Sequence, residues 1–277
     1  MIKTTPFEMV FIIRDIMKLI DANICLGSDF VKHPIVNHES FIVMENVKTA
    51  ETPAELISVM DKFEIQQAAV WHRAMFDYDP IKGNEILTET IGGYGDRLLP
   101  VWTILPAISD TEFAPDTFFD KMKKNGVKML KAFPLQNRYI LCDVTMGDQL
   151  KAMEELQIPL YLEPQPDYQY IYDVLKEFPN LTVIINNIGI WPSARLIYPL
   201  LKRYPNVYLE TGDMGMTHAY EQICEKFGSH RLLYGSNFPS NSPGCSLNCL
   251  LKAKISDEER ENIAHRNIER LLGEVKL

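Results

Sequence analysis

The sequence predicts an α/β fold built on a parallel sheet of eight strands. Short apolar segments recur along the 277 residues, and helical or looped segments separate them. Each connecting segment must return over the sheet before the next strand begins, which favours parallel strands. A count of eight is typical of a closed (β/α)8 TIM barrel, although the spacing alone also allows an open doubly wound sheet. Because no linker or low-complexity stretch divides the chain, we expect a single domain over residues 1–277.

The expected elements alternate after a lead-in segment over residues 1–18. We expect strands at 19–27, 68–72, 98–105, 127–133, 159–163, 181–187, 207–211 and 231–236. We expect helices at 52–62, 84–90, 116–124, 146–156, 168–178, 194–203 and 218–227, with a last helical region over 256–272. Thr52, Pro53 and Glu55 form a capping box that opens the first of these helices. Residues 28–51 have no such pattern and are expected to form a long loop over the barrel mouth.

Composition and charge limit the classes of partner. The chain is 46% hydrophobic and 23% charged, which is typical of a soluble globular protein, and its formal charge is −9. This charge argues against nucleic acid and anionic membranes as partners. No secretory signal is present and no apolar run approaches the ~18 residues of a membrane span. Five scattered cysteines fit reduced thiols, so we expect a cytoplasmic protein.

Polar side chains follow nearly every expected strand. In a (β/α)8 barrel the carboxyl ends of the strands meet at one mouth, where binding and catalytic residues gather. A buried polar group at such an end needs a partner, so this convergence predicts a polar pocket for a small molecule. The residues concerned are Asn23, Cys25, His72, Lys131, Glu163, Gln165, Asn187, Glu210, Thr211, Asp213, Ser236 and Asn237.

The segment Gly235-Ser236-Asn237-Phe238-Pro239 closes the eighth expected strand. It resembles the last barrel strand of the amidohydrolase superfamily, in the amidohydrolase-related branch of TIM-barrel metal-dependent hydrolases, which has Gly-Ser-Asp-x-Pro there. The resemblance runs from Asp21 to Gly273, and the segments 204–208 and 267–273 match almost letter for letter. It implies a single TIM barrel and a hydrolase-like activity.

The five positions that hold metal ligands in the family carry other residues here. The aspartate of the eighth strand is replaced by Asn237, and the other four positions hold Asn23, Cys25, Glu163 and Asn187. Neutral amides are poor ligands for zinc, and no carboxylate at residue 237 can take a proton from metal-bound water. We therefore expect no cofactor, with zinc or another divalent metal as the less favoured alternative.

Lys131 and Glu163 end neighbouring strands and are the expected catalytic pair. They form either an ion pair that fills the space of a metal, or a site in which a neutral Lys131 acts as base or Schiff-base nucleophile. Cys25 and His72 also end adjacent strands, where a thiolate–imidazolium pair competes with an inert buried cysteine. Asp213 is either an acid or base, or a turn residue.

Two functions follow from these residues. The first is a hydrolase-like enzyme with a metal-free or altered site that acts on a small carboxylate, ester or lactone. In it, Lys131 orients the anion, Glu163 acts as acid or base, and Asn23, Asn187 and Asn237 supply hydrogen bonds. The second is a catalytically inactive pseudoenzyme that binds a small ligand or a partner protein. A homodimer through the barrel helices is compatible with either.

Overall fold

The computed structural model describes residues 17–27, 49–108, 111–189 and 193–277. Eight strands form one parallel sheet in chain order. They are β1 (Ile20–Leu26), β2 (Gln67–His72), β3 (Leu98–Thr103), β4 (Met129–Ala132), β5 (Leu160–Leu162), β6 (Val183–Ile185), β7 (Val207–Glu210) and β8 (Leu232–Leu233). The prediction of eight strands is confirmed.

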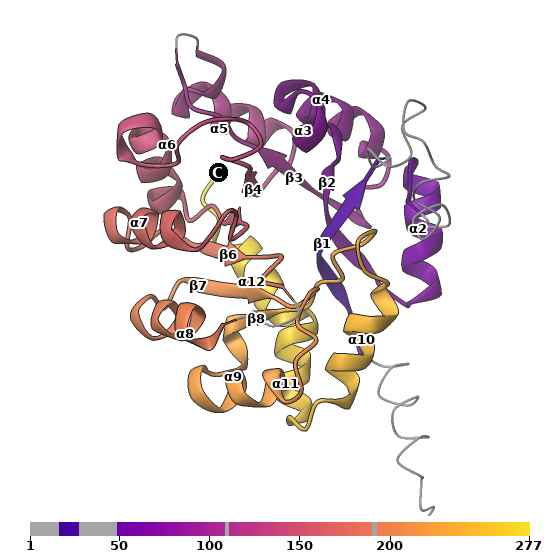
Figure 1. The fold of residues 1–277 in the computed structure, drawn as a ribbon. Coiled ribbons are helices and arrows are strands. Elements are labelled where there is room, and N and C mark those ends of the chain that lie inside the picture. The colour runs from indigo at the N-terminus through magenta and orange to yellow at the C-terminus, as the bar shows by residue number, and fades with distance from the viewer. Residues whose placement is uncertain (1–16, 28–48, 109–110, 190–192) are drawn as a thin grey trace, which may run out of the picture.

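The sheet curls into a nearly closed barrel. The segment after β8 returns to β1, where Ala22 donates its backbone N–H to Tyr234 and Cys25 donates to Phe238, each at 2.8 Å. Figure 1 shows helices α4 to α9 on the outside of the ring of strands. The expected (β/α)8 barrel is therefore confirmed, and the alternative of an open doubly wound sheet is not.

Most helices lie close to their predicted places, whereas α3 and α10 were not predicted. They are α2 (Pro53–Lys62), α3 (Ala74–Asp77), α4 (Pro80–Ile91), α5 (Pro115–Lys124), α6 (Asp143–Leu156), α7 (Gln169–Glu177), α8 (Ala194–Arg203), α9 (Ala219–Phe227), α10 (Pro243–Lys252), α11 (Asp257–Glu261) and α12 (Asn267–Glu274). Short turns η3 (Thr111–Phe113), η4 (Ser229–Arg231) and η5 (Asn262–Arg266, π-helical) join them. None of the helices in the described ranges is long and apolar enough to span a membrane.

Local chemistry explains two helix starts. The predicted capping box is present in α2, where the Thr52 hydroxyl accepts from Glu55 N–H at 3.3 Å and the Glu55 carboxylate accepts from Thr52 N–H at 3.0 Å. Helix α4 begins earlier than predicted because Asp79 accepts from the N–H groups of Ile81 and Lys82. The lead-in segment and the loop over the mouth fall mostly on residues 1–16 and 28–48, outside the described residues.

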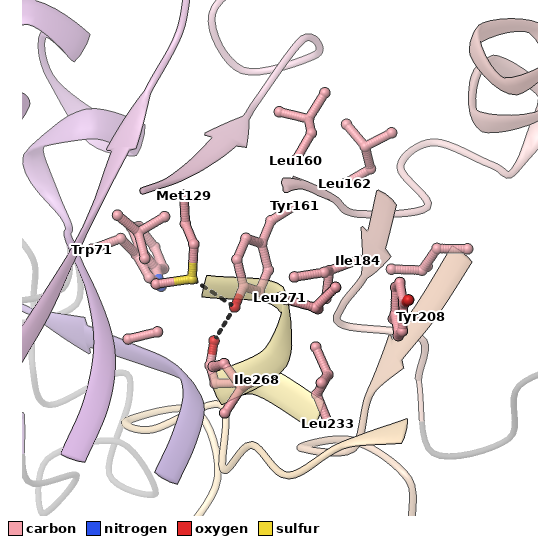
Figure 2. Close-up of a cluster of buried hydrophobic side chains, with 14 of the residues drawn as sticks. Trp71, Met129, Leu160, Tyr161, Leu162, Ile184, Tyr208, Leu233, Ile268 and Leu271 are labelled. Carbon is pink, nitrogen blue, oxygen red and sulfur yellow. Dashed lines mark hydrogen bonds between the residues drawn. The ribbon is translucent and has the colours of Figure 1, made fainter. Parts of the chain in front are cut away.

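The barrel interior is packed with large side chains below the mouth. Figure 2 shows Tyr161 of β5 reaching into this cluster beside Met129, Ile184 and Ile268. The Tyr161 hydroxyl donates to the Ala22 carbonyl at 2.8 Å and contacts the Met129 sulfur at 3.7 Å. This hydroxyl ties β5 to β1 across the barrel, so the floor of the mouth is closed.

Candidate functional site at the carboxyl ends of the strands

Asn23 of β1 connects polar side chains from four other parts of the barrel. Its carbonyl oxygen Oδ1 accepts from Trp71 Nε1 at 3.2 Å and from Lys131 Nζ at 3.4 Å. Its amide nitrogen Nδ2 donates to Glu210 Oε2 at 3.1 Å and to Asn237 Oδ1 at 3.5 Å. The asparagine is 2% exposed, so its amide is committed to these partners. It is the centre of what we call the mouth cluster, made of Asn23, Lys131, Glu163, Asn186, Asn187, Glu210, Asp213 and Asn237.

Lys131 and Glu163 form a buried ion pair in this cluster. Lys131 Nζ lies 3.1 Å from Glu163 Oε1, and the lysine is 1% exposed. The ammonium also lies over the Trp71 ring at 4.6 Å from its centroid. Oε1 accepts two more hydrogen bonds, from Asn186 Nδ2 at 3.2 Å and Asn187 Nδ2 at 2.8 Å. The carboxylate is thus held by one cation and two amides. These contacts offset much of the desolvation free energy of the buried charges.

Consecutive asparagines reach the same carboxylate because of a backbone turn after β6. Successive side chains of a strand point to opposite faces, so Asn186 and Asn187 would diverge in extended backbone. Asn187 has φ 52°, in the left-handed region that asparagine tolerates better than most residues. This turn brings the second amide back to Glu163.

The loop after β7 adds another carboxylate, Asp213, which lies between β7 and α9. Asp213 Oδ1 accepts from Asn237 Nδ2 at 3.1 Å and from Asn241 Nδ2 at 2.5 Å. Asn237 has φ 53°, again left-handed, which allows its amide to reach both Asn23 and Asp213. Asp213 is therefore part of the mouth cluster.

The cluster member Glu210 and its neighbour Asp21 are carboxyl groups that are fully buried. Burial raises the pKa of Asp21 to about 7 and, with the charge of Asp21 as a smaller cause, raises the pKa of Glu210 to about 8. Asp21 Oδ1 accepts from the N–H groups of Asn23 and Ser236, each at 3.0 Å, whereas Oδ2 has no hydrogen-bond partner among the described residues. A protonated carboxyl avoids the cost of a buried charge, so both groups favour the neutral form in the folded protein.

Gly235 leaves the space that Glu210 occupies. A Cβ atom at residue 235 would lie 1.9 Å from Glu210 Oε1, far inside van der Waals contact. We expect Gly235→Ala to displace Glu210 from Asn23 and to lower the free energy of unfolding by about 3 kcal/mol, measured by urea denaturation. Gly95→Ala is the control, because nothing lies within 4 Å of a Cβ there. Equal stability of the two variants would contradict this packing.

Cys25 and His72 do not form the second pair that the sequence allows. The Cys25 thiol points to the Leu26 carbonyl at 3.6 Å, and His72 Nδ1 accepts from Ala74 N–H at 3.1 Å. Burial lowers the pKa of His72, which disfavours the imidazolium needed to stabilise a thiolate. No hydrogen bond joins the two residues, both of which lie in the described ranges.

The structure thus brings together most of the predicted site residues and adds others. Asn23, Lys131, Glu163, Asn187, Asp213 and Asn237 all lie in the mouth cluster, whereas Cys25 and His72 bond to the backbone of Leu26 and Ala74. Sequence reasoning missed Asn186, Asn241 and the burial of Asp21. In the sequence, only the position of Asn186 beside Asn187 indicated that it could belong to the site. In a regular strand its side chain would point away from the side chain of Asn187.

The family model called Amidohydrolase matches residues 48–273. The chain therefore belongs to the amidohydrolase family, as the resemblance implied. No curated protein matches the chain.

Solved structures share the fold at low sequence identity. An uncharacterized TIM-barrel protein from Bordetella bronchiseptica is 20% identical, with a TM-score of 0.71 over 93% of this chain and 99% of that chain. A dihydroxybenzoic acid decarboxylase from Polaromonas is 16% identical, with a TM-score of 0.68 over 93% and 97%. A 5-carboxyvanillate decarboxylase from Novosphingobium aromaticivorans is 13% identical, with a TM-score of 0.70 over the same shares.

The expectation of no cofactor is contradicted by these neighbours, since both decarboxylase structures contain bound manganese. The expectation rested on the residues that replace the family's metal ligands in this chain. In the described ranges, no group of three or more histidine, cysteine, aspartate or glutamate side chains is placed to hold a metal ion. The amides and the Lys131 ammonium at the mouth do not fit a divalent cation.

Proposed function

We propose that the chain is a hydrolase-like enzyme that acts on a small carboxylate, ester or lactone at the barrel mouth. The observation that carries the proposal is the buried Lys131–Glu163 ion pair, 3.1 Å apart at the carboxyl ends of β4 and β5. In TIM-barrel enzymes this end of the barrel holds the active site. The decarboxylases of similar fold act on aromatic carboxylic acids by name, which agrees with a small carboxylate as ligand.

Glu163 is suited to act as the general base. Its Oε1 atom is committed to Lys131, Asn186 and Asn187. Within the described residues Oε2 makes no hydrogen bond, and Glu163 lines a cavity of about 20 Å³ together with Phe133. That volume accommodates about one water molecule. A carboxylate with one anchored and one free oxygen can accept a proton from such a water.

Lys131 is suited to stabilise negative charge. When water attacks an ester or lactone carbonyl, its proton passes to Glu163 and the carbonyl oxygen becomes an oxyanion. The fixed ammonium of Lys131, in a site closed to solvent, would stabilise this oxyanion more strongly than in water. Collapse of the intermediate breaks the bond to the leaving oxygen, which takes the proton back from Glu163.

A pseudoenzyme that binds a small ligand without turnover is the second candidate. The observation that favours it is that Asn23 and Glu163 Oε1 are already bonded to other members of the mouth cluster, Asn23 with four partners. Polar groups already paired with one another cost free energy to separate, so a substrate must replace those bonds. This candidate predicts binding with no hydrolysis.

The test is the hydrolysis of a panel of aryl acetates and small lactones by the purified chain. We expect Glu163→Gln to lower kcat/KM by about 100-fold or more, because the amide cannot take the proton. Glu155→Gln, on the exposed face of α6, is the matched control and keeps the wild-type rate. Circular dichroism confirms that each variant is folded.

The outcomes separate the two candidates. Turnover that Glu163→Gln retains in full would overturn the assigned base. Binding of a panel member by calorimetry, with no turnover in any variant, would establish the pseudoenzyme instead.

A further inference from the structure

A second hollow lies on the surface between the segments that follow β3 and β4. It has a volume of about 660 Å³ and is lined from residues 106–108, 134–135 and 138–140 and from the start of α6. Four of its lining residues are large apolar side chains that face water: Ile108 is 88% exposed, Leu135 59%, Ile140 72% and Val144 92%. Of the four other exposed large hydrophobic residues in the described ranges, only Tyr78 is exposed to a comparable extent. Apolar side chains concentrated in this way mark a binding surface.

The hollow has one charged lining residue, Arg138. In the described part of the chain, no hydrogen bond or ion pair joins its guanidinium to another residue. The other polar lining groups already have partners, since the Tyr139 hydroxyl donates to the Ile104 carbonyl at 3.3 Å and the Thr145 hydroxyl donates to the Ile140 carbonyl. A guanidinium with its donors free is suited to bidentate binding of a carboxylate. This local positive charge contrasts with the net charge of −9.

Size and chemistry together define the ligand. The volume lies within the range of about 300–1,000 Å³ that is usual for small-molecule sites. Apolar walls favour an alkyl or aryl body, and the single cation favours one negative charge. Pro134 and Leu135 line both this hollow and the cavity at Glu163, so the two sites are neighbours.

We propose that this hollow binds an amphipathic monocarboxylate, with its apolar body against Ile108, Leu135 and Val144 and its carboxylate on Arg138. The site concerns binding and does not require turnover at Glu163. It therefore stands or falls separately from the function proposed for the mouth cluster.

The test is calorimetric binding of octanoate to the full chain, compared with octanamide, which has the same body and no charge. We expect octanoate to bind at least about 10-fold more tightly than octanamide, and Arg138→Met to weaken octanoate by a similar factor. Val144→Asp, on a side chain that water already surrounds, is expected to weaken octanoate by placing a negative charge at the rim. Arg195→Met on the exposed face of α8 is the matched control and leaves binding unchanged.

Two results would overturn the proposal. One is octanoate affinity that is absent in the wild type or unaltered by Arg138→Met. The other is a dimer in sedimentation velocity that Val144→Asp dissociates and octanoate does not affect. In that case the apolar face would be an interface between two copies of this chain.

Discussion

Lys131→Met is expected to lower the free energy of unfolding by about 3 to 5 kcal/mol. The substitution leaves Glu163 as a buried carboxylate with two amide donors and no cation. Removing one partner of a buried pair costs far more than the pair contributes, because the remaining charge loses its compensation. Methionine has a similar length and packs well between Trp71 and Phe133, so lost volume is a small part of the effect. Urea denaturation at neutral pH measures it.

The double variant separates charge from packing. Adding Glu163→Gln to Lys131→Met removes the unpaired charge, and we expect most of the lost stability to return. Lys82→Met is the matched control, because its ion pair with Glu85 is exposed at 68% and 50%, and ion pairs in water contribute little to stability. If the double variant lost as much unfolding free energy as the two single variants together, the unpaired charge of Glu163 would not explain the instability of Lys131→Met.

Much of the fold was predictable because the residues that begin and end its helices lie close together in the sequence. The capping box at Thr52 and Glu55 located the start of α2 correctly, and the expected helix at 116–124 ends where α5 ends. Several strands were predicted too long, as at 98–105, where the sheet ends at Thr103. Apolar residues continue past the last ladder hydrogen bond there, and hydrophobicity does not report where pairing stops. Helix α10 was missed because Gly244, serine and asparagine favour loops.

The site was predictable only where regular strands position its side chains. Lys131 and Glu163 were expected to be neighbours because β4 and β5 are adjacent and parallel, and this contact is present. The two left-handed asparagines, Asn187 and Asn237, redirect side chains in a way that strand alternation cannot anticipate. Whether these residues catalyse a reaction stays a prediction.

The burial of Asp21 was the hardest feature of the site to predict from the sequence, because it depends on the packing around this residue. No cation in the described ranges pairs with it, and its second oxygen has no partner. It lies with Glu210 of β7, Tyr161 of β5 and Tyr234 after β8, and the pKa values of both tyrosine hydroxyls are also raised by burial and by these carboxyls. No charge near it favours ionisation.

The Asp21→Asn variant is therefore expected to be less sensitive to alkaline pH than the wild type. The folded pKa of Asp21, about 7, is above the unfolded value of 3.8, so its contribution to stability is complete below about pH 4 and is lost as pH rises through 7. At about 1.4 kcal/mol per pH unit, the wild type should lose about 3 kcal/mol more than Asp21→Asn between pH ~5 and pH ~8. Removing the Asp21 charge also lowers the pKa of Glu210, for which that charge is a smaller cause than burial, so the change at Glu210 has the same sign.

Urea denaturation across this pH range measures the difference. Asparagine keeps the oxygen that accepts from Asn23 and Ser236 and places its amide where Asp21 has an unpaired oxygen. Asp120→Asn, on the exposed face of α5, should follow the wild-type curve. Parallel curves for the wild type and Asp21→Asn would mean that Asp21 is ionised in the folded protein at neutral pH. The electrostatics beneath the mouth cluster would then be those of a charged floor rather than a neutral one.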